Sequence, residues 1–224
     1  MKGLLLLSMI FGITFGVPIP GSPESDAYID QVLENLRQVI AENNLDPAPL
    51  PDGSVGFSDT ILGITFHGSA SVSDGYFRGL STIARNGGTN LDFNADTSKV
   101  TLSANVGIGA SKAGYSARAE FMGVGVSASA DIDVEKIDVY FDAEMCITEG
   151  CTLKLTKFDI KEIGHIDVHV HGLGPLDWIL DTVVGFVADL IRGFLADVLE
   201  GPIRDLLQGI LDDLIPDFPS LMKL

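Results

Sequence analysis

Basic residues and cysteines are scarce in this sequence of 224 residues. Lysine and arginine together number 14, against 31 aspartates and glutamates, so the net charge at pH 7 is −17. Such a charge opposes electrostatic attraction to the phosphates of nucleic acids and of anionic bilayers. The composition therefore predicts no nucleic-acid partner.

Sequence motifs of catalysis are also missing. No Gly-x-Ser-x-Gly nucleophile elbow occurs, and the serines stand in linkers or alternating stretches. The segment GVGVS at 123–127 reads as a strand with no helix after it, so it is not a phosphate-binding loop. Adjacent carboxylates such as Asp212 and Asp213 are expected by chance in so acidic a chain. We predict a protein that is not an enzyme and needs no cofactor.

The cysteines of the chain are Cys146 and Cys151, which flank the turn-forming segment TEG at 148–150. In an oxidising compartment they can close a disulfide across a hairpin, worth about 2 kcal/mol for so short a loop. The alternative is a redox or metal pair, but two cysteines alone lack the ligand count for zinc. We predict the disulfide and no metal site.

The first 16 residues, MKGLLLLSMIFGITFG, have one lysine, an apolar run and small residues at their end. This pattern predicts a signal peptide cleaved after Gly16 and a secreted, extracellular mature chain of residues 17–224. A membrane span needs about 20 apolar residues, and the uncharged run between Asp181 and Asp189 has seven. No transmembrane segment is predicted, and the mature chain suits one domain.

An amphipathic helix is expected over residues 24–43. Apolar residues recur there at helical spacing, with Ser22 and Pro23 as a helix cap and first turn. The segment NNLDPAPLPDGS ends the helix, because it contains three prolines and several other turn formers.

From about residue 57 to 171 the apolar period changes to two, as in Val100, Leu102, Ala104, Val106 and Ile108. Such alternation predicts an antiparallel meander with one face in the core. Turns are expected at 85–90, 110–114 and 148–150. Interior glycines and alanines predict bends or an element packed closely on the sheet, so we expect strong curvature.

The segment GFVADLIRGFLADVLEGPIRDLLQGILDDLIP, residues 185–216, divides into blocks of eight that each begin with Gly. Aspartate is fifth in every block, at Asp189, Asp197, Asp205 and Asp213, and places two, three, six and seven are almost all apolar. Eight residues make two turns plus about 80°, so the apolar stripe winds around the helix. Either the helix is embraced from several sides or it breaks, and Gly201-Pro202 is the natural break. We expect helices over 175–199 and 202–214.

The segment HIDVHVH places His165, Asp167, His169 and His171 on one face of a strand. The alternate residues are apolar, so the histidines are expected on the solvent face. A pH-sensitive role and a metal site are the alternatives to a plain surface position.

Two stretches, YFRGLSTIARNGG at 76–88 and LTKFDIKEIGHIDVHVHGLGPLDWILDTVVGFVADLI at 155–191, resemble the group 7 mite allergens and their arthropod relatives. That family is similar in fold to insect juvenile-hormone-binding proteins and to half of a bactericidal/permeability-increasing protein. The resemblance implies an α+β fold in which a highly curved antiparallel sheet wraps around a long C-terminal helix. It also implies a carrier of lipids or other hydrophobic molecules, without catalytic residues.

We therefore expect a secreted carrier that holds a lipid-like small molecule between the sheet and the C-terminal helix by apolar burial. The alternative is a structural or interaction protein that acts through its acidic surface or by self-association. The two differ in packing, because a carrier must keep an apolar cavity that side chains do not fill. The expected ligand-lining residues are Trp178, Ile179, Phe186, Leu190, Phe194 and Leu195 from the helix and Val106, Ile108, Phe121, Val124, Val126, Val139 and Phe141 from strands.

Overall fold

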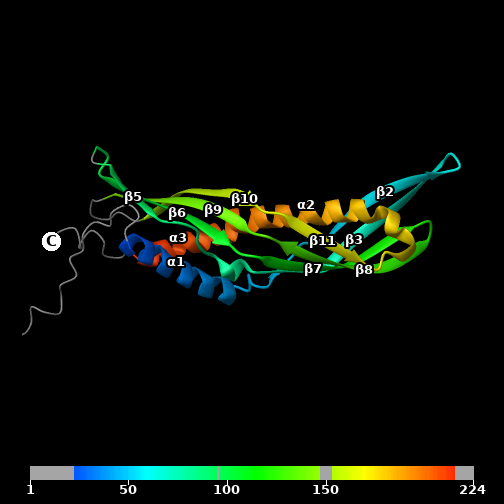
Figure 1. Cartoon of the computed structure of the whole chain (residues 1–224), viewed down its shortest axis with the longest axis horizontal. Helices are drawn as coiled ribbons and strands as arrows, with labels where there is room; N and C mark the ends of the chain where they lie inside the picture. The colour runs from blue at the N-terminus through cyan, green and yellow to red at the C-terminus, as the bar shows by residue number, and fades with distance from the viewer. Residues whose placement is uncertain (1–22, 95, 147–152, 215–224) are drawn as a thin grey trace, which may run out of the picture.

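A computed structural model describes residues 23–94, 96–146 and 153–214. It shows an elongated α+β domain in which curved antiparallel strands enclose the C-terminal helices, as expected (Figure 1). The helices and helical turns are α1 (Pro23–Glu42), η1 (Leu80–Thr82), η2 (Gly174–Ile179), α2 (Leu180–Val198), η3 (Leu199–Ile203) and α3 (Arg204–Leu214). The strands are β1 (Ala48–Pro49), β2 (Gly53–Ile61), β3 (Ile64–Arg78), β4 (Ala84–Arg85), β5 (Asn90–Asn94), β6 (Lys99–Ile108), β7 (Ser111–Phe121), β8 (Val124–Val134), β9 (Ile137–Cys146), β10 (Lys154–Ile163) and β11 (Ile166–His171).

The strands form two antiparallel sheets, and each strand belongs to one of them. One sheet has the order β1-β3-β7-β8-β11 with β2 on β3, and the other has the order β10-β9-β6-β4 with β5 on β6. Ile108 pairs with Ile137 in one sheet and Ser111 pairs with Val134 in the other, so β6–β7 and β8–β9 keep one register across the boundary. The expected curved sheet is therefore a long ribbon that passes from one half of the molecule to the other.

The turn predicted at 110–114 is wrong. Residues 111–114 belong to β7, and β6 and β7 lie in different sheets instead of pairing as a hairpin. The chain only kinks at Gly109, whose N–H donates to the Thr82 hydroxyl at 3.2 Å. The turn at 85–90 lies between β4 and β5, whereas the one at 148–150 falls outside the described residues.

Helix α1 forms where its periodicity predicted it, and its apolar stripe is buried. Ile29, Val32, Leu33, Leu36 and Ile40 are each at most 1% exposed. The helix packs on α3 and near β4, in the half of the molecule that holds the five-stranded sheet. Its expected cap, Ser22, lies outside the described residues.

The C-terminal helix does not break at Gly201-Pro202, contrary to our prediction. A π-helical turn, η3, carries Pro202 and joins α2 to α3. A wider turn accommodates a residue that lacks an N–H, so the chain stays helical. Asp189, Asp197 and Asp205 are exposed, while the apolar stripe is buried against α1 and both sheets. The C-terminal helix is thus packed against other elements on several sides, which was the alternative to a break that the winding apolar stripe allowed.

Candidate functional site

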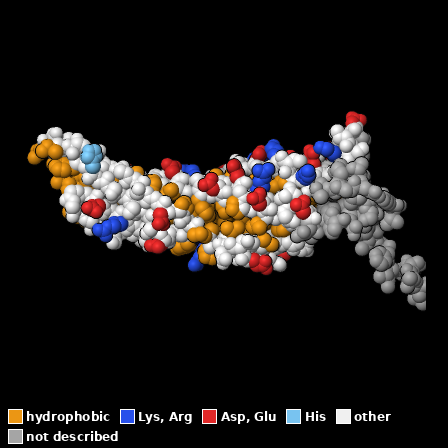
Figure 2. Space-filling view, turned by 180° about the vertical axis from the view of Figure 1, so that it is seen from behind, with side chains coloured by type: hydrophobic (Ala, Val, Ile, Leu, Met, Phe, Trp, Pro, Cys, Tyr) orange, Lys and Arg blue, Asp and Glu red, His pale blue; other side chains and the backbone are white. Residues whose placement is uncertain are grey.

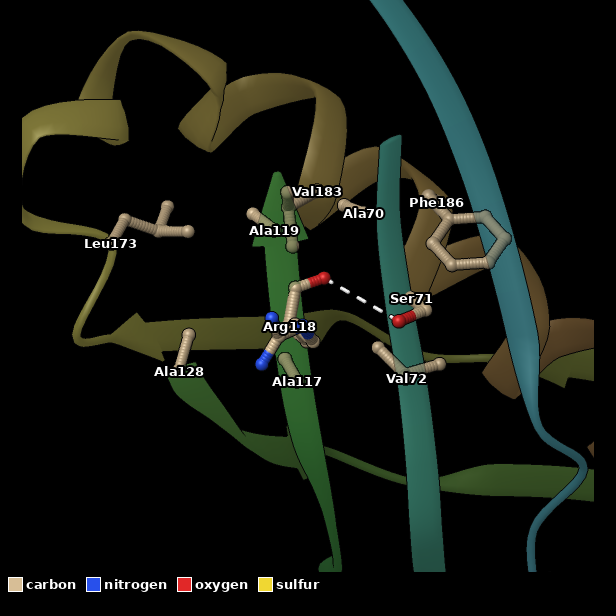
Figure 3. A pocket seen from close by; sticks show the side chains of 10 residues that line it. All are labelled: Ala70, Ser71, Val72, Ala117, Arg118, Ala119, Ala128, Leu173, Val183 and Phe186. Atoms are coloured by element: carbon tan, nitrogen blue, oxygen red, sulfur yellow. Dashed lines mark hydrogen bonds between the residues drawn. The ribbon is translucent and has the colours of Figure 1, made fainter. Parts of the chain in front are cut away.

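The seam between α2 and the inner face of the six-stranded sheet is the candidate binding site. A small cavity lies there, with room for about one water molecule, about 10 Å³. Figure 3 shows Leu173, Val183 and Phe186 facing three neighbouring strands across it. The other lining residues are Ala70, Ser71, Val72, Ala117, Arg118, Ala119 and Ala128.

Small side chains on the sheet let α2 approach closely at this seam. Four of the lining positions are alanine, and Ala117 and Ala128 are only half-buried although they pack against the core. At Gly53, the first residue of β2, an added Cβ would lie 2.9 Å from Phe186 and 3.0 Å from Leu190. Alanine and glycine on the sheet therefore leave room for α2, and Ala117 and Ala128 at the border stay partly open to solvent.

An aromatic cluster closes one end of the seam. Trp178 is the one tryptophan of the chain. The centroid of its ring lies 5.1 Å from that of Phe121 and 5.4 Å from that of Phe57, and both contacts are edge-on. Phe66 adds an edge-on contact to Phe121 at 6.5 Å. Trp178 nevertheless remains 49% exposed, so its indole borders both the cluster and solvent.

The predicted lining residues lie in three different places. Phe121, Trp178 and Phe186 lie at the seam or in its aromatic cluster. Val126 and Leu190 are partly buried, and Phe194 contacts Phe77 at 5.7 Å. The other predicted side chains are fully buried, namely Ile179, Leu195, Val106, Ile108, Val139 and Phe141.

Val124 is not at the seam. It is half-exposed at the start of β8, beside the β7–β8 turn. Phe57, Phe66 and the alanines were missed by sequence reasoning, because alanine gives little alternation signal and residue 57 was taken as a strand boundary. The alternation of Phe57 with polar neighbours in the segment GFSDT could have indicated an inward-facing aromatic side chain.

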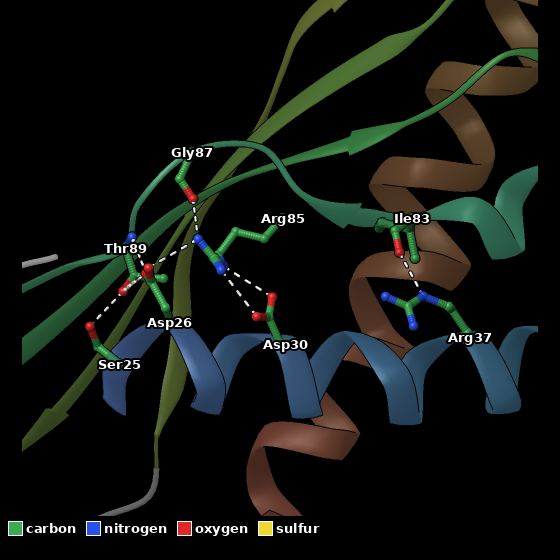
Figure 4. Close-up of polar contacts among 8 residues, drawn as sticks. All are labelled: Ser25, Asp26, Asp30, Arg37, Ile83, Arg85, Gly87 and Thr89. Carbon is green, nitrogen blue, oxygen red and sulfur yellow. Dashed lines mark hydrogen bonds and ion pairs between the residues drawn. The ribbon is translucent and has the colours of Figure 1, made fainter. Parts of the chain in front are cut away.

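A polar clamp fixes α1 to the segment between η1 and β5, at the other end of the molecule (Figure 4). Arg85 donates to both carboxylate oxygens of Asp30 at 3.0 Å and lies 3.1 Å from Asp26. Hydrogen bonds from the N–H and hydroxyl of Thr89, together with Arg85, lower the pKa of Asp26 despite some desolvation. The clamp contains no apolar surface for a ligand, and its polar groups bond to one another.

The histidine strand lies on the solvent face, as predicted. His165, His169 and His171 are exposed, and His165 lies 3.0 Å from its neighbour Asp167. Within the described part of the chain, no cluster of three or more His, Cys, Asp or Glu residues could hold a metal ion. The predicted disulfide between Cys146 and Cys151 falls outside what the structure describes.

The fold and the seam define an α+β domain in which curved antiparallel sheets enclose a C-terminal helix. Apolar residues at the border of the seam stay partly exposed to solvent. A model of the group 7 allergen family matches residues 24–211, and the chain belongs to this family. Mite allergen Lep d 7 of Lepidoglyphus destructor is 23% identical over 167 residues, which are 69% of each chain.

Two solved structures are similar to this chain. A lipopolysaccharide binding protein matches with a TM-score of 0.49 and 16% identity, over 88% of this chain and 40% of that one, so this chain spans less than half of that protein. Takeout 1 of Epiphyas postvittana matches with a TM-score of 0.35 and 12% identity, over 88% and 92% of the two chains. No helix in the described ranges is both long and apolar enough to cross a membrane.

Proposed function

We propose that this protein is a secreted carrier of a hydrophobic or amphiphilic small molecule, held at the seam between α2 and the six-stranded sheet. The observation that carries the proposal is the seam itself, where eight of the ten lining residues are apolar and three of these, Ala117, Ala128 and Phe186, are only half-buried. Burial of apolar ligand surface at about 25 cal/mol per Å² is the driving force that such a site offers. The leader-like residues 1–16 support export.

Ligand entry requires the seam to widen. A cavity of about 10 Å³ holds a water-sized volume and no acyl chain or terpenoid. The half-buried side chain of Phe186, which lines the cavity, and that of Leu190, which lies with it against Gly53, can move because they are not held by a full shell of neighbours. Ligand binding therefore involves a rearrangement of α2 or of these side chains.

The small cavity favours one alternative function, a structural or interaction protein whose C-terminal helix is simply core. Such a protein is packed to ordinary density and needs no ligand. It would act through its acidic surface or by self-association.

Native mass spectrometry of the protein secreted by a eukaryotic host, followed by organic extraction, tests the proposal. We expect an added mass of a few hundred daltons that extracts as a lipid. The variant Ala117→Phe, which fills the cavity wall, should lower the occupied fraction about 10-fold, whereas Ala84→Phe on the exposed face of β4 should not. A clean unliganded mass, with no thermal stabilisation by fatty acids, sterols or terpenoids, would transfer the assignment to the structural alternative.

A further inference from the structure

Large apolar side chains are exposed together at one end of the molecule. They come from the β2–β3 turn, the β7–β8 turn and the segment where η2 leads into α2, which share one end in Figure 1. Figure 2 shows hydrophobic side chains gathered at this end, which lies on the left of that view. We call this surface the apolar tip and define it by Ile61, Leu62, Ile64, Met122, Val124, Trp178 and Leu180.

Both turns of the apolar tip place an apolar residue where the backbone favours a polar one. Leu62 and Gly63 have φ of 51° and 82°, and Met122 and Gly123 have φ of 50° and 78°. Two-residue loops with two positive φ angles prefer Asn-Gly or Asp-Gly, because Asn and Asp tolerate the left-handed conformation. Leu62 is 98% exposed and Met122 is 53% exposed, so contacts within the fold do not account for these choices.

The β5–β6 turn, at the opposite end of the molecule, provides an internal comparison. Its described residues are polar, and Ser98 has a φ of 51°, the same as Leu62. The Asn94 side chain accepts hydrogen bonds from the N–H groups of Asp96 and Thr97 at 3.0 and 3.1 Å. A turn of this protein that faces water thus uses polar residues, which indicates that the apolar tip faces something else.

We propose that the apolar tip inserts into the surface of an electrically neutral lipid layer. Charge decides the kind of surface, since exposed Asp59, Glu120 and Asp177 each stand within two residues of a tip residue in the sequence. Over the described residues 56–68, 117–127 and 174–182, which carry the tip, Arg118 is the one lysine or arginine. An anionic bilayer would repel this end of a chain whose net charge is −17. A zwitterionic or uncharged lipid surface carries no such penalty.

The distance from the end of the β2–β3 turn to the nearest carboxylate matches the depth of insertion at a membrane interface. Asp59 lies three residues before Leu62, about 10 Å along the strand at 3.3 Å per residue. Interfacial elements bury their apolar face by about 5–10 Å, and a carboxylate at that depth stays in the headgroup layer. Trp178 adds an indole of the kind that is enriched where membrane and water meet.

The composition of the apolar tip favours lipid over a protein partner. Six of its seven residues are Ile, Leu, Met or Val. Binding hot spots between proteins are enriched in Trp, Tyr and Arg, and Leu and Val are under-represented there. Aliphatic side chains on separate turns suit a soft surface that conforms to them.

Flotation of the secreted protein with neutral phosphatidylcholine vesicles tests this inference. We expect the protein to float with the vesicles and the double variant L62N/M122N to lose about 100-fold in partition coefficient, roughly 10-fold for each side chain removed. The matched control is Ser98→Asn, which places the same residue at the same φ in the β5–β6 turn and should leave partitioning unchanged. Because Asn fits the left-handed turn, the double variant should melt no lower than the parent protein.

Fluorescence quenching and the oligomeric state are measured on the same proteins. Lipids brominated on their acyl chains should quench the fluorescence of Trp178, and the double variant should abolish this quenching.

Equal flotation of parent and double variant, or no flotation of the parent, overturns the inference. A parent dimer that the double variant converts to a monomer also overturns it, because the occupant is then a second copy. Leu62 and Met122 do not line the seam, so co-purified ligand is scored separately and the carrier proposal can fail or hold independently.

Discussion

Tyr28 and Tyr115 differ in whether their hydroxyl groups have a partner. The Tyr115 hydroxyl donates to the carbonyl of Pro51 at 3.0 Å, whereas the buried Tyr28 oxygen has no hydrogen-bond partner among the described residues. Burial raises the pKa of Tyr28 to about 12, and burial followed by the charge of Asp52 raises that of Tyr115 to about 12. Both phenols therefore stay neutral at any pH near neutrality.

Replacing each tyrosine by phenylalanine should have different effects on stability. Tyr28→Phe removes an unpaired buried hydroxyl and should leave the free energy of unfolding unchanged or raise it by up to about 1 kcal/mol. Tyr115→Phe removes a made hydrogen bond and should lower it by about 1 kcal/mol. Urea unfolding of both variants checks this, and a larger loss for Tyr28→Phe would show that its hydroxyl has a partner.

Asp46 links the loop after α1 to the start of η1. Its carboxylate accepts hydrogen bonds from the N–H groups of Gly79 and Ser81 at 3.0 and 2.9 Å and from the Ser81 hydroxyl. Burial opposes ionisation, but these hydrogen bonds and Arg78 outweigh it and lower the pKa of Asp46 below its usual value of 3.8. The carboxylate is thus held ionised in the folded protein.

The lowered pKa predicts how Asp46 contributes to stability at different pH. Its contribution is fully present above pH about 4, the unfolded value, and is lost as the pH falls through the lower folded value. Asp46→Asn should therefore cost about 1 kcal/mol at pH 6 and progressively less below pH 4. Unfolding curves from pH 6 to 2.5 measure this, with exposed Asp92→Asn as the control for one lost charge. A cost that stays constant with pH contradicts the assignment.

At the scale of elements, glycine decides how closely β2, β3 and β7 can approach. An added Cβ at Gly68 would overlap the Phe57 ring and lie 2.6 Å from the carbonyl oxygen of Glu120. The nearest atom to a Cβ at Gly56, on the neighbouring strand, is 3.9 Å away. Only one of these two strand glycines is therefore required by packing.

We expect Gly68→Ala to destabilise the protein by about 1–3 kcal/mol, because a backbone carbonyl cannot move aside as a side chain can. Gly56→Ala should change the stability by less than about 0.5 kcal/mol. Thermal unfolding compares the two variants directly. Equal melting temperatures would mean that β3 and β7 can shift apart without cost.

Element boundaries also show how far local sequence patterns reach. Period-two alternation correctly predicted the buried face of β6, where Val100, Leu102 and Ala104 point inward. It could not predict that the chain near Gly109 kinks and continues, because a turn and a kink use the same small residues. The structure has a kink and no turn, because β6 and β7 keep one continuous register against β9 and β8.

At the scale of the whole molecule, excess negative charge opposes folding. Acidic residues exceed basic ones by 31 to 14, and the described ion pairs are mostly exposed. Exposed pairs contribute little, about 0–1 kcal/mol each, so general repulsion is the larger electrostatic effect.

Salt should therefore stabilise this protein. Raising NaCl from 10 to 200 mM shortens the screening length from about 30 to about 7 Å, which weakens repulsion between distant carboxylates more than it weakens close pairs. We expect the melting temperature to rise by about 2–4 °C for each kcal/mol of relieved repulsion. Calorimetry at pH 7, with sucrose of equal osmolality as the control, measures it. A falling melting temperature would mean that the ion pairs outweigh the repulsion.

The sequence by itself determined the elements and their faces, because helical and strand periodicities are local and the choice of buried side follows from them. It therefore predicted α1, the alternating strands, the exposed aspartates of the C-terminal helix and the family to which the chain belongs. Only the tertiary structure decided that Pro202 sits in a continuous helix, that alanines line the sheet side of the seam, and that two apolar turns share one end of the molecule with Trp178. Those features depend on which distant segments come together, and the placement of residues 62, 122 and 178 at one end of the molecule has no periodic signature in the chain.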